Sequence, residues 1–187
     1  MGYVTVNQLN RNLEQNMKTN ILAFAIFSSV FVASSHAADG TINFTGNITD
    51  DTCDISTASK TQTVALGTIG SNSFSAPGTT SAATGFSVVL SNCPAAHSNV
   101  SVKFDGTPEG GNPSVLALTD TPTKATGVGI QLRDADGSVL PLFADSKPVA
   151  INAGNATLNF SAAYVSTAST VTAGDANSTA NFTVAYN

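Results

Sequence analysis

The chain has 187 residues, enough for a leader segment and one domain of ordinary size. Only 10% of the residues are charged and the formal net charge is −5, which excludes the basic stripe that a nucleic-acid-binding protein needs. The mean hydropathy of +0.13 excludes a disordered polar chain, and the many β-branched residues favour short strands over helices.

The first 37 residues are predicted to be a leader that is removed on export. Residues 17–37 contain one lysine, a 13-residue mostly apolar stretch and small residues that end at Ala37. This order is typical of a secretory signal peptide cleaved after Ala37. A retained anchor is the alternative, but a membrane span needs about 20 apolar residues. We expect translation to start at Met17, or residues 1–16 to be an elongated, discarded leader.

The segment that follows the cleavage site alternates strictly between apolar and polar residues. Ile42, Phe44, Gly46 and Ile48 share one face of residues 41–49, and the other face is polar. This period of two predicts a strand. The periodicity alone is equally compatible with the first strand of a self-contained sandwich.

Further short alternating or apolar segments follow along the chain, separated by Gly, Pro and Asp turns. Residues 134–137, which read Asp-Ala-Asp-Gly, predict a hairpin connection. Short strands with turns every 8–12 residues predict an all-β sandwich of immunoglobulin-like type. The expected strands are 63–66, 85–93, 100–104, 115–118, 128–133, 139–142, 157–165 and 180–186.

The two cysteines, Cys53 and Cys93, predict one disulfide if the chain is exported. On the chain-entropy model, closing a loop of about 40 residues stabilises the fold by about 4 kcal/mol. The alternative is two unrelated buried thiols, which would require a reducing compartment.

The sequence offers little catalytic or metal-binding chemistry. His97 is the single histidine beyond the leader and lies in a predicted turn, so we expect a solvated loop residue. No nucleophile elbow supports a serine hydrolase. Asp134 and Asp136 resemble the start of a calcium loop but lack its remaining ligands, so a hairpin turn is favoured. We therefore expect no enzyme, no metal and no cofactor.

Four landmarks of residues 38–187 resemble the major-pilin family of type 1-like chaperone–usher fimbriae. Residues 40–48 precede Cys53, and residues 85–93 end in the second cysteine. Residues 115–118 are followed by 127–132. Gly174 lies fourteenth from the end and Tyr186 is penultimate. The resemblance implies an incomplete immunoglobulin-like β-sandwich that lacks its last strand.

The resemblance also implies how such a subunit assembles. Residues 38–50 would be an N-terminal donor-strand extension of the sandwich domain 51–187, with Ile42, Phe44, Gly46 and Ile48 entering a groove of a neighbouring subunit. The groove strand would carry Gly174, Phe182, Val184 and Tyr186. A periplasmic chaperone would fill the groove first, and an outer-membrane usher would exchange it for the next subunit's extension.

The function expected from this resemblance is a structural subunit of a cell-surface fimbria that supports adhesion, with copies of itself or sibling subunits as partners. Only Ala38 and Asp39 precede Gly40, a shorter lead than close relatives of the major-pilin type often have. A minor adaptor subunit that links shaft to tip is therefore the alternative. A tip adhesin would need a second domain, and a secreted hydrolase or calcium protein is the third class.

Overall fold

The computed structural model describes residues 40–46, 48 and 52–186. The leader 1–37, the start at Met17 and the cleavage after Ala37 lie outside these residues. The chain divides after Asn47 into two units. In the first unit, residues 40–46 form no regular secondary structure, and the second unit contains all the strands described below.

The larger sheet has six antiparallel strands in the order β1-β2-β8-β6-β5-β4. Its centre is β8, which pairs with β2 on one side and β6 on the other, so that Phe86 lies opposite Phe160 and Ile130 opposite Tyr164. The strands are β1 (Asp54–Ile55), β2 (Thr84–Ser91), β4 (Pro108–Glu109), β5 (Asn112–Leu116), β6 (Val128–Asp134) and β8 (Ala156–Ser166).

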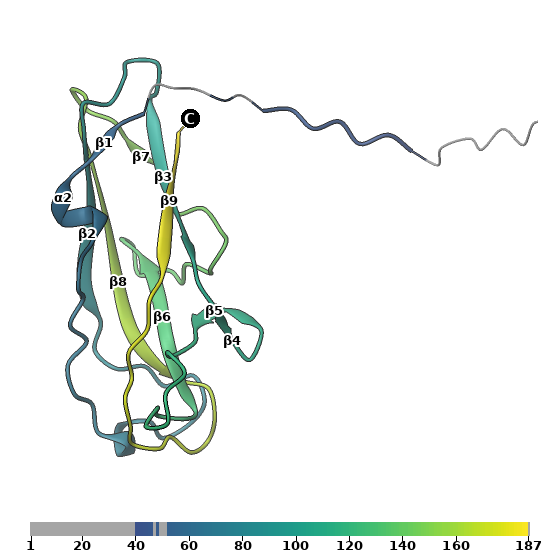
Figure 1. Ribbon diagram of the computed structural model, residues 1–187, viewed down its shortest axis with the longest axis vertical. Helices are drawn as coiled ribbons and strands as arrows, with labels where there is room; N and C mark the ends of the chain where they lie inside the picture. The colour runs from purple at the N-terminus through teal and green to yellow at the C-terminus, as the bar shows by residue number, and fades with distance from the viewer. Residues whose placement is uncertain (1–39, 47, 49–51, 187) are drawn as a thin grey trace, which may run out of the picture. The chain divides into compact units, whose positions relative to one another are not determined.

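The smaller sheet has three antiparallel strands in the order β7-β3-β9. They are β7 (Val149–Ala150), β3 (Asn99–Asp105) and β9 (Asn181–Tyr186). The last strand of the chain, β9, pairs with β3 from Asn181 opposite Asp105 to Tyr186 opposite Val100. It is therefore an edge strand of its sheet, as Figure 1 shows in yellow.

The core lies between the two sheets because alternate residues of each strand are apolar and point inward. Val88 and Leu90 of β2 and Val100 and Val102 of β3 are fully buried, and Leu158 of β8 is nearly so. Two layers of antiparallel strands around such a core form an immunoglobulin-like sandwich. The predicted all-β class is confirmed.

Helical structure in the described residues is limited to two short turns, α2 (Thr57–Lys60) and the 3₁₀ helix η1 (Ser71–Ser73). The side chain of Ser56 caps α2 by accepting a hydrogen bond from the Ser59 amide. No described helix has the length and apolar character needed to cross a membrane.

Two predicted strands did not form as expected. Residues 63–66 and 139–142 are not assigned to any strand of the structure. The second segment still returns along β6 in a hairpin, because Val139 bridges Arg133 and the amide of Leu140 donates to the carbonyl of Leu132. Two two-residue strands, β4 and β7, were not predicted as separate elements.

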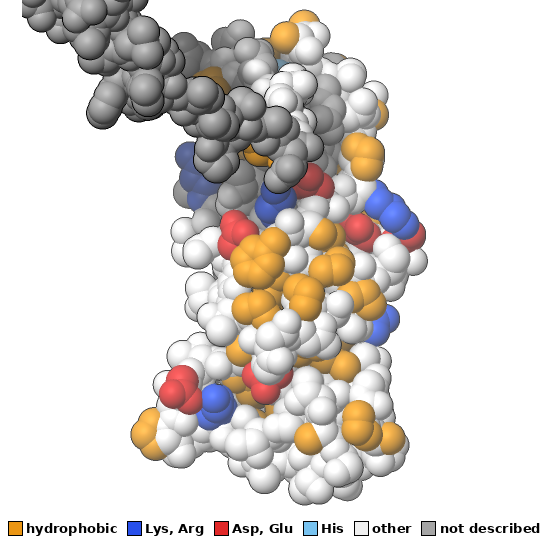
Figure 2. Space-filling model, turned by 90° about the vertical axis from the view of Figure 1, so that its right-hand side faces the viewer, with side chains coloured by type: hydrophobic (Ala, Val, Ile, Leu, Met, Phe, Trp, Pro, Cys, Tyr) orange, Lys and Arg blue, Asp and Glu red, His pale blue; other side chains and the backbone are white. Residues whose placement is uncertain are grey.

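Charged side chains are sparse on the face seen in Figure 2, where apolar groups lie among uncharged polar surface. Val139 and Phe143 are among the exposed large apolar residues of the domain. Lys103 and Asp145 form one of the few ion pairs, with 3.5 Å between their charged atoms.

A candidate binding groove beside the last strand

A groove lies beside the beginning of β9 and the segment that precedes it, and is formed by two adjoining cavities of about 710 and 390 Å³. One wall, which we call the first rim, is residues 59–69, and the other, the second rim, is residues 171–182. Figure 1 shows the chain descending from α2 on one side and β9 with its preceding segment on the other. The two cavities share four lining residues: Gly67, Tyr164, Ala176 and Asn177.

The first rim has unused main-chain hydrogen-bonding groups. Residues 62–69 form no main-chain hydrogen bond with another main-chain group of the described chain. The rim is tethered instead through the side chain of Gln62, which donates to the carbonyl of Ser87 at 3.2 Å. Val64 and Leu66 are half-buried while Ala65 is exposed. A segment with alternating side chains and free amides is able to accept another strand.

The second rim is bonded on one side only. The amide of Asp175 donates to the carbonyl of Thr123 at 2.7 Å, and the amide of Ala125 donates to the carbonyl of Asp175 at 2.9 Å. Further along, β9 pairs with β3 and with no other strand of the described residues. The opposite edge of the second rim therefore faces the groove without main-chain pairing to any described segment.

The close packing behind the second rim explains the glycine at position 174. A Cβ atom there would lie 2.4 Å from the carbonyl oxygen of Thr123, 2.5 Å from the amide nitrogen of Ala125 and 2.7 Å from the carbonyl carbon of Lys124. All three are main-chain atoms, which cannot move aside individually. A side chain at this position would push the rim out of place.

The floor of the larger cavity is aromatic and aliphatic. Phe104 packs edge-on against Phe160 with 5.1 Å between ring centroids, and Phe86 lies 5.9 Å from Phe104. Phe182 of β9 completes the cluster at 6.4 Å from Phe104. A floor of this kind favours apolar side chains as occupants. Ile130, Leu132 and Ala162 also line it.

Tyr164 stands where the two cavities meet. Its hydroxyl donates to the carbonyl of Ala176 in the second rim at 3.0 Å. The amide of Tyr164 donates to the hydroxyl of Ser81 at 3.0 Å, and the amide of Ser81 donates to the carbonyl of Tyr164 at 2.9 Å. Burial raises the pKa of the Tyr164 hydroxyl, so this group remains a proton donor at neutral pH.

The four predicted residues of the groove strand occupy different places. Phe182 lines the larger cavity and Gly174 the smaller one. Val184 and Tyr186 lie further along β9 and pack against the core, outside the lining of these two cavities. Of the four predicted residues, Gly174 and Phe182 therefore line the two cavities, whereas Val184 and Tyr186 lie further along β9, outside their lining.

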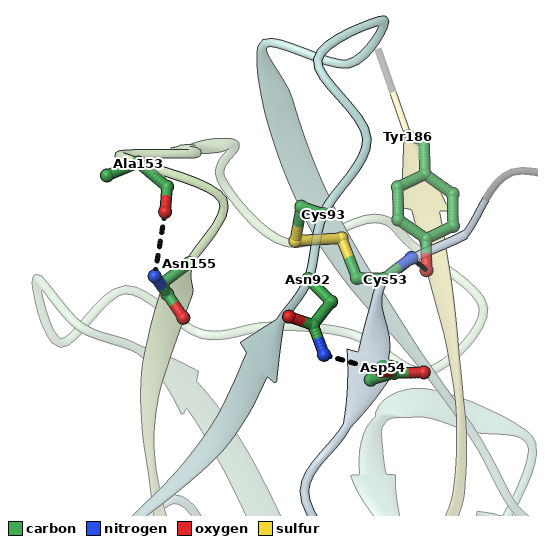
Figure 3. Close-up of a disulfide and its surroundings, with 7 residues drawn as sticks. All are labelled: Cys53, Asp54, Asn92, Cys93, Ala153, Asn155 and Tyr186. Carbon is green, nitrogen blue, oxygen red and sulfur yellow. Dashed lines mark hydrogen bonds between the residues drawn. A yellow bond between two sulfur atoms is a disulfide. The ribbon is translucent and has the colours of Figure 1, made fainter.

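Tyr186 lies beside the disulfide that the sequence predicted, and that disulfide is present between Cys53 and Cys93. The amide of Cys53 donates to the Tyr186 hydroxyl at 3.2 Å, as Figure 3 shows. Asn92 donates from its side-chain amide to the Asp54 carboxylate at 2.8 Å. These contacts tie the beginning of β1 to the end of β2 and to β9.

His97 was expected to be a solvated loop residue, and this expectation was wrong in part. It lies in the loop before β3, but its ring packs 4.9 Å from the ring of Tyr186 and is half-buried. The apolar stacking surface of the tyrosine outweighs solvation of the imidazole.

The predicted donor residues are exposed in the isolated chain. Ile42 is 79%, Phe44 91% and Ile48 96% solvent-accessible, and a Cβ at Gly46 would have no neighbour within 4 Å. Large apolar side chains with this exposure are unusual outside binding surfaces.

Asp134 and Asp136 form a turn rather than a candidate metal site. The amide and hydroxyl of Ser138 donate to the Asp136 carboxylate, which also pairs with Lys147. The amide of Gly137 donates to the carbonyl of Asp134 at 2.9 Å. No three candidate ligands gather around a common point anywhere in the described residues.

The sequence did not predict the part that two features, the first rim and Tyr164, play in the groove. The first rim was expected to be a short strand over residues 63–66, which the structure does not form, and the sequence named no partner for it. Tyr164 lies within the expected strand 157–165, and no role in a groove was assigned to it. Its bond to Ala176 depends on how the two segments fold together, which no local pattern reports.

Comparisons with known proteins agree on one family. The family model described as "Fimbrial protein" matches residues 42–187. The fimbrial subunit type 1 of Salmonella typhimurium is 38% identical over 186 residues, covering 91% of this chain and all of the relative.

Solved structures give the same picture. A type I fimbria protein of Burkholderia pseudomallei is 41% identical, with a TM-score of 0.57 over 79% of this chain and 97% of that one. A chaperone–usher pilus structure has a TM-score of 0.62 over 80% of this chain and 96% of that one, at 23% identity, which supports the fold alone.

Proposed function

The chain belongs to the fimbrial protein family and is a structural subunit of cell-surface fimbriae, and we propose that it polymerises by lending residues 38–50 to the groove of a neighbouring subunit. The sandwich of residues 51–187 accepts the same segment from its other neighbour. The role is structural, without catalytic turnover.

The observation that supports this proposal is the groove itself. Its floor is apolar, and each of its two rims has an edge free of main-chain pairing. A strand placed between such edges gains main-chain hydrogen bonds for affinity and side-chain pockets for register. The segment with the matching pattern is residues 41–48, in which every second residue is apolar or glycine.

The energies are large enough to hold a fibre. Burying Ile42, Phe44 and Ile48 contributes roughly 1.5–3 kcal/mol each. Each main-chain hydrogen bond that an inserted strand makes with a rim adds about 1 kcal/mol. Gly46 has no side chain, which allows the inserted strand to approach its partner closely at that position.

The exposed apolar surface of a lone subunit also indicates why it needs a chaperone during export. A lone subunit exposes both an apolar groove and an apolar extension, and unpaired strand edges promote aggregation. We infer that a periplasmic chaperone covers the groove until an outer-membrane usher exchanges it for the next subunit's extension. Because one surface donates and another accepts, the contact is head-to-tail and yields an open filament.

The test is a chain that lacks residues 38–48. We expect it to form no fibres by itself but to bind a synthetic peptide of residues 40–48, because its groove is intact. Fibres are scored by electron microscopy and peptide binding by fluorescence anisotropy. If the truncated chain still joins subunits on both sides, the donor role is refuted.

A matched pair of full-length variants separates the two faces of the extension. Replacing Ile42, Phe44 and Ile48 with serine removes the apolar face and should abolish fibres. Replacing Thr41, Asn43 and Thr45 with serine alters the polar face and should leave fibres intact. Equal effects of the two variants would contradict insertion of one face. The abundance of the chain in sheared fibres then distinguishes a shaft subunit from an adaptor.

A further inference from the structure

Tyr164 occupies the boundary between the two cavities of the groove. The larger cavity, of about 710 Å³, lies on the side of Phe182, and the smaller one, of about 390 Å³, lies on the side of Gly174. Tyr164 lines both. Its backbone is fixed there by pairing with Ile130 and by the two hydrogen bonds with Ser81.

The direction of the Ala176 carbonyl follows from its neighbours. In an extended segment, successive residues direct their main-chain groups to opposite sides. The carbonyl of Asp175 accepts from the amide of Ala125, and that of Asn177 accepts from the amide of Thr119, both on the side away from the groove. The intervening carbonyl of Ala176 therefore points to the groove side, where the Tyr164 hydroxyl donates to it at 3.0 Å.

The consequence is that one groove-side acceptor of the second rim is already occupied. A strand that extends its pairing along this rim finds free positions beside β9, but at residue 176 its amide meets a carbonyl oxygen that already accepts from the Tyr164 hydroxyl. The amide must displace that hydroxyl, which yields no net gain, or share the oxygen with it, which adds less than a free carbonyl would. Main-chain pairing of an inserted strand beyond Ala176, toward the smaller cavity, therefore brings little further free energy of binding.

We propose that Tyr164 is a positioning residue that ends the main-chain pairing of an incoming strand at Ala176 and so sets how many residues of the strand the groove accepts. This inference rests on the proposed function, because it concerns the same groove and the same occupant. It assigns the length preference of the groove to the tyrosine hydroxyl rather than to the size of the cavities.

The experiment compares the lengths of peptides that the purified chain without residues 38–48 binds, because the extension of the full mature chain would compete for the groove; the sequence of residues 52–187 without further change is the wild type here. Three labelled peptides are used, with the sequences of residues 40–48, 38–48 and 40–51, so that the strand is lengthened at either end. Affinities are measured by fluorescence anisotropy on the wild-type chain, on Tyr164→Phe and on Tyr186→Phe. The last variant is the matched control, because it also loses one phenol hydrogen bond but lies outside the lining of both cavities.

In the wild-type chain, both longer peptides should bind within about twofold of the 40–48 peptide. In Tyr164→Phe, the freed carbonyl can accept one more amide, so one longer peptide should gain about fivefold in affinity. Tyr186→Phe should keep the length profile of the wild type. A general loss of stability would weaken all three peptides alike and would leave their ratios unchanged.

A fivefold gain of a longer peptide in the wild type would overturn the proposal, and so would an unchanged length profile in Tyr164→Phe. The wild-type comparison requires no variant, so the proposal is still tested if Tyr164→Phe fails to fold. Failure of the 40–48 peptide to bind the wild type at all is a different result, which refutes the proposed function itself and this inference with it.

Discussion

Gly174 is held by main-chain atoms of residues 123–125 that leave no space for a Cβ. We predict that Gly174→Ala lowers the free energy of unfolding by about 1–3 kcal/mol, as overpacking does elsewhere. It should also weaken binding of the 40–48 peptide, because the rim moves. Urea unfolding and anisotropy measure the two effects. Gly85→Ala is the control, since its nearest contact would be an ordinary 3.9 Å to the carbonyl of Phe160.

The carboxyl of Asp136 leads to a prediction about stability at low pH. Its hydrogen bonds with Lys147 and then with Ser138 lower the pKa of its carboxyl well below the ordinary value. A carboxyl whose pKa is lowered by folding stabilises the fold above its unfolded pKa of about 3.9, and this contribution disappears as the pH falls below that value. The difference in Tm between the wild type and Asp136→Asn should therefore be constant above about pH 5 and shrink below pH 4. A difference that instead grows with acid would contradict the assignment.

Residue-scale contacts were the least predictable from the sequence. The disulfide was predictable because an exported chain with two cysteines has one pairing available. The stacking of His97 on Tyr186 was not, because it joins residues 89 positions apart whose neighbours give no common signal. The tight packing around Gly174 was also hidden, since a glycine in a turn and a glycine under a crossing backbone look alike in a sequence.

At the scale of elements, the disulfide joins β1 to the end of β2. Only two residue pairs connect these strands, Asp54 with Ser91 and Ile55 with Leu90. Closing a 40-residue loop should stabilise the fold by about 4 kcal/mol. We predict a loss of this size for the double variant Cys53→Ala/Cys93→Ala, measured by urea unfolding with the groove filled by the 40–48 peptide. Reduction of the wild type should reproduce the loss, and a change below about 1 kcal/mol would contradict it.

Gly46 tests how closely the donor element approaches its acceptor. In its own chain a Cβ at this position would meet nothing within 4 Å, so Gly46→Val should leave the unfolding free energy of the domain unchanged. In the 40–48 peptide the same change should lower affinity at least about fivefold, because overpacking costs about 1–3 kcal/mol. Thr45→Val, on the opposite face, should have a small effect. Equal losses in the two peptides would argue against a close approach at Gly46.

Strand length decided which elements were predictable. The segments that became β2, β3, β6, β8 and β9 each contain at least six residues, enough for a period of two to stand out. The strands β4 and β7 contain two residues each, too few to show a period of two. The first rim shows the opposite case: a strand was expected over residues 63–66, yet it forms no ladder because no described segment pairs with its main chain.

At the scale of the whole molecule, the chain has one donating segment and one accepting groove. A chain without residues 38–48 keeps its groove, so it can accept the free extension at one end of a fibre, but it has no strand to donate in turn. Each such chain should therefore end growth at the fibre end that it joins. In a head-to-tail contact, one truncated chain therefore ends one fibre, which would not follow from a symmetric contact.

We predict that the mean fibre length falls as the inverse of the fraction of truncated chains. At one truncated chain in twenty, the mean should be about twenty subunits if both forms are taken up equally. Electron microscopy of mixtures gives the lengths. The control adds Phe182→Asp to the truncated chain, which puts a charge in the apolar cavity that Phe182 lines and should prevent uptake, so that lengths return to those of the unmixed protein. Shortening by this double variant, or none by the truncated chain, would show that fibres grow through a different contact.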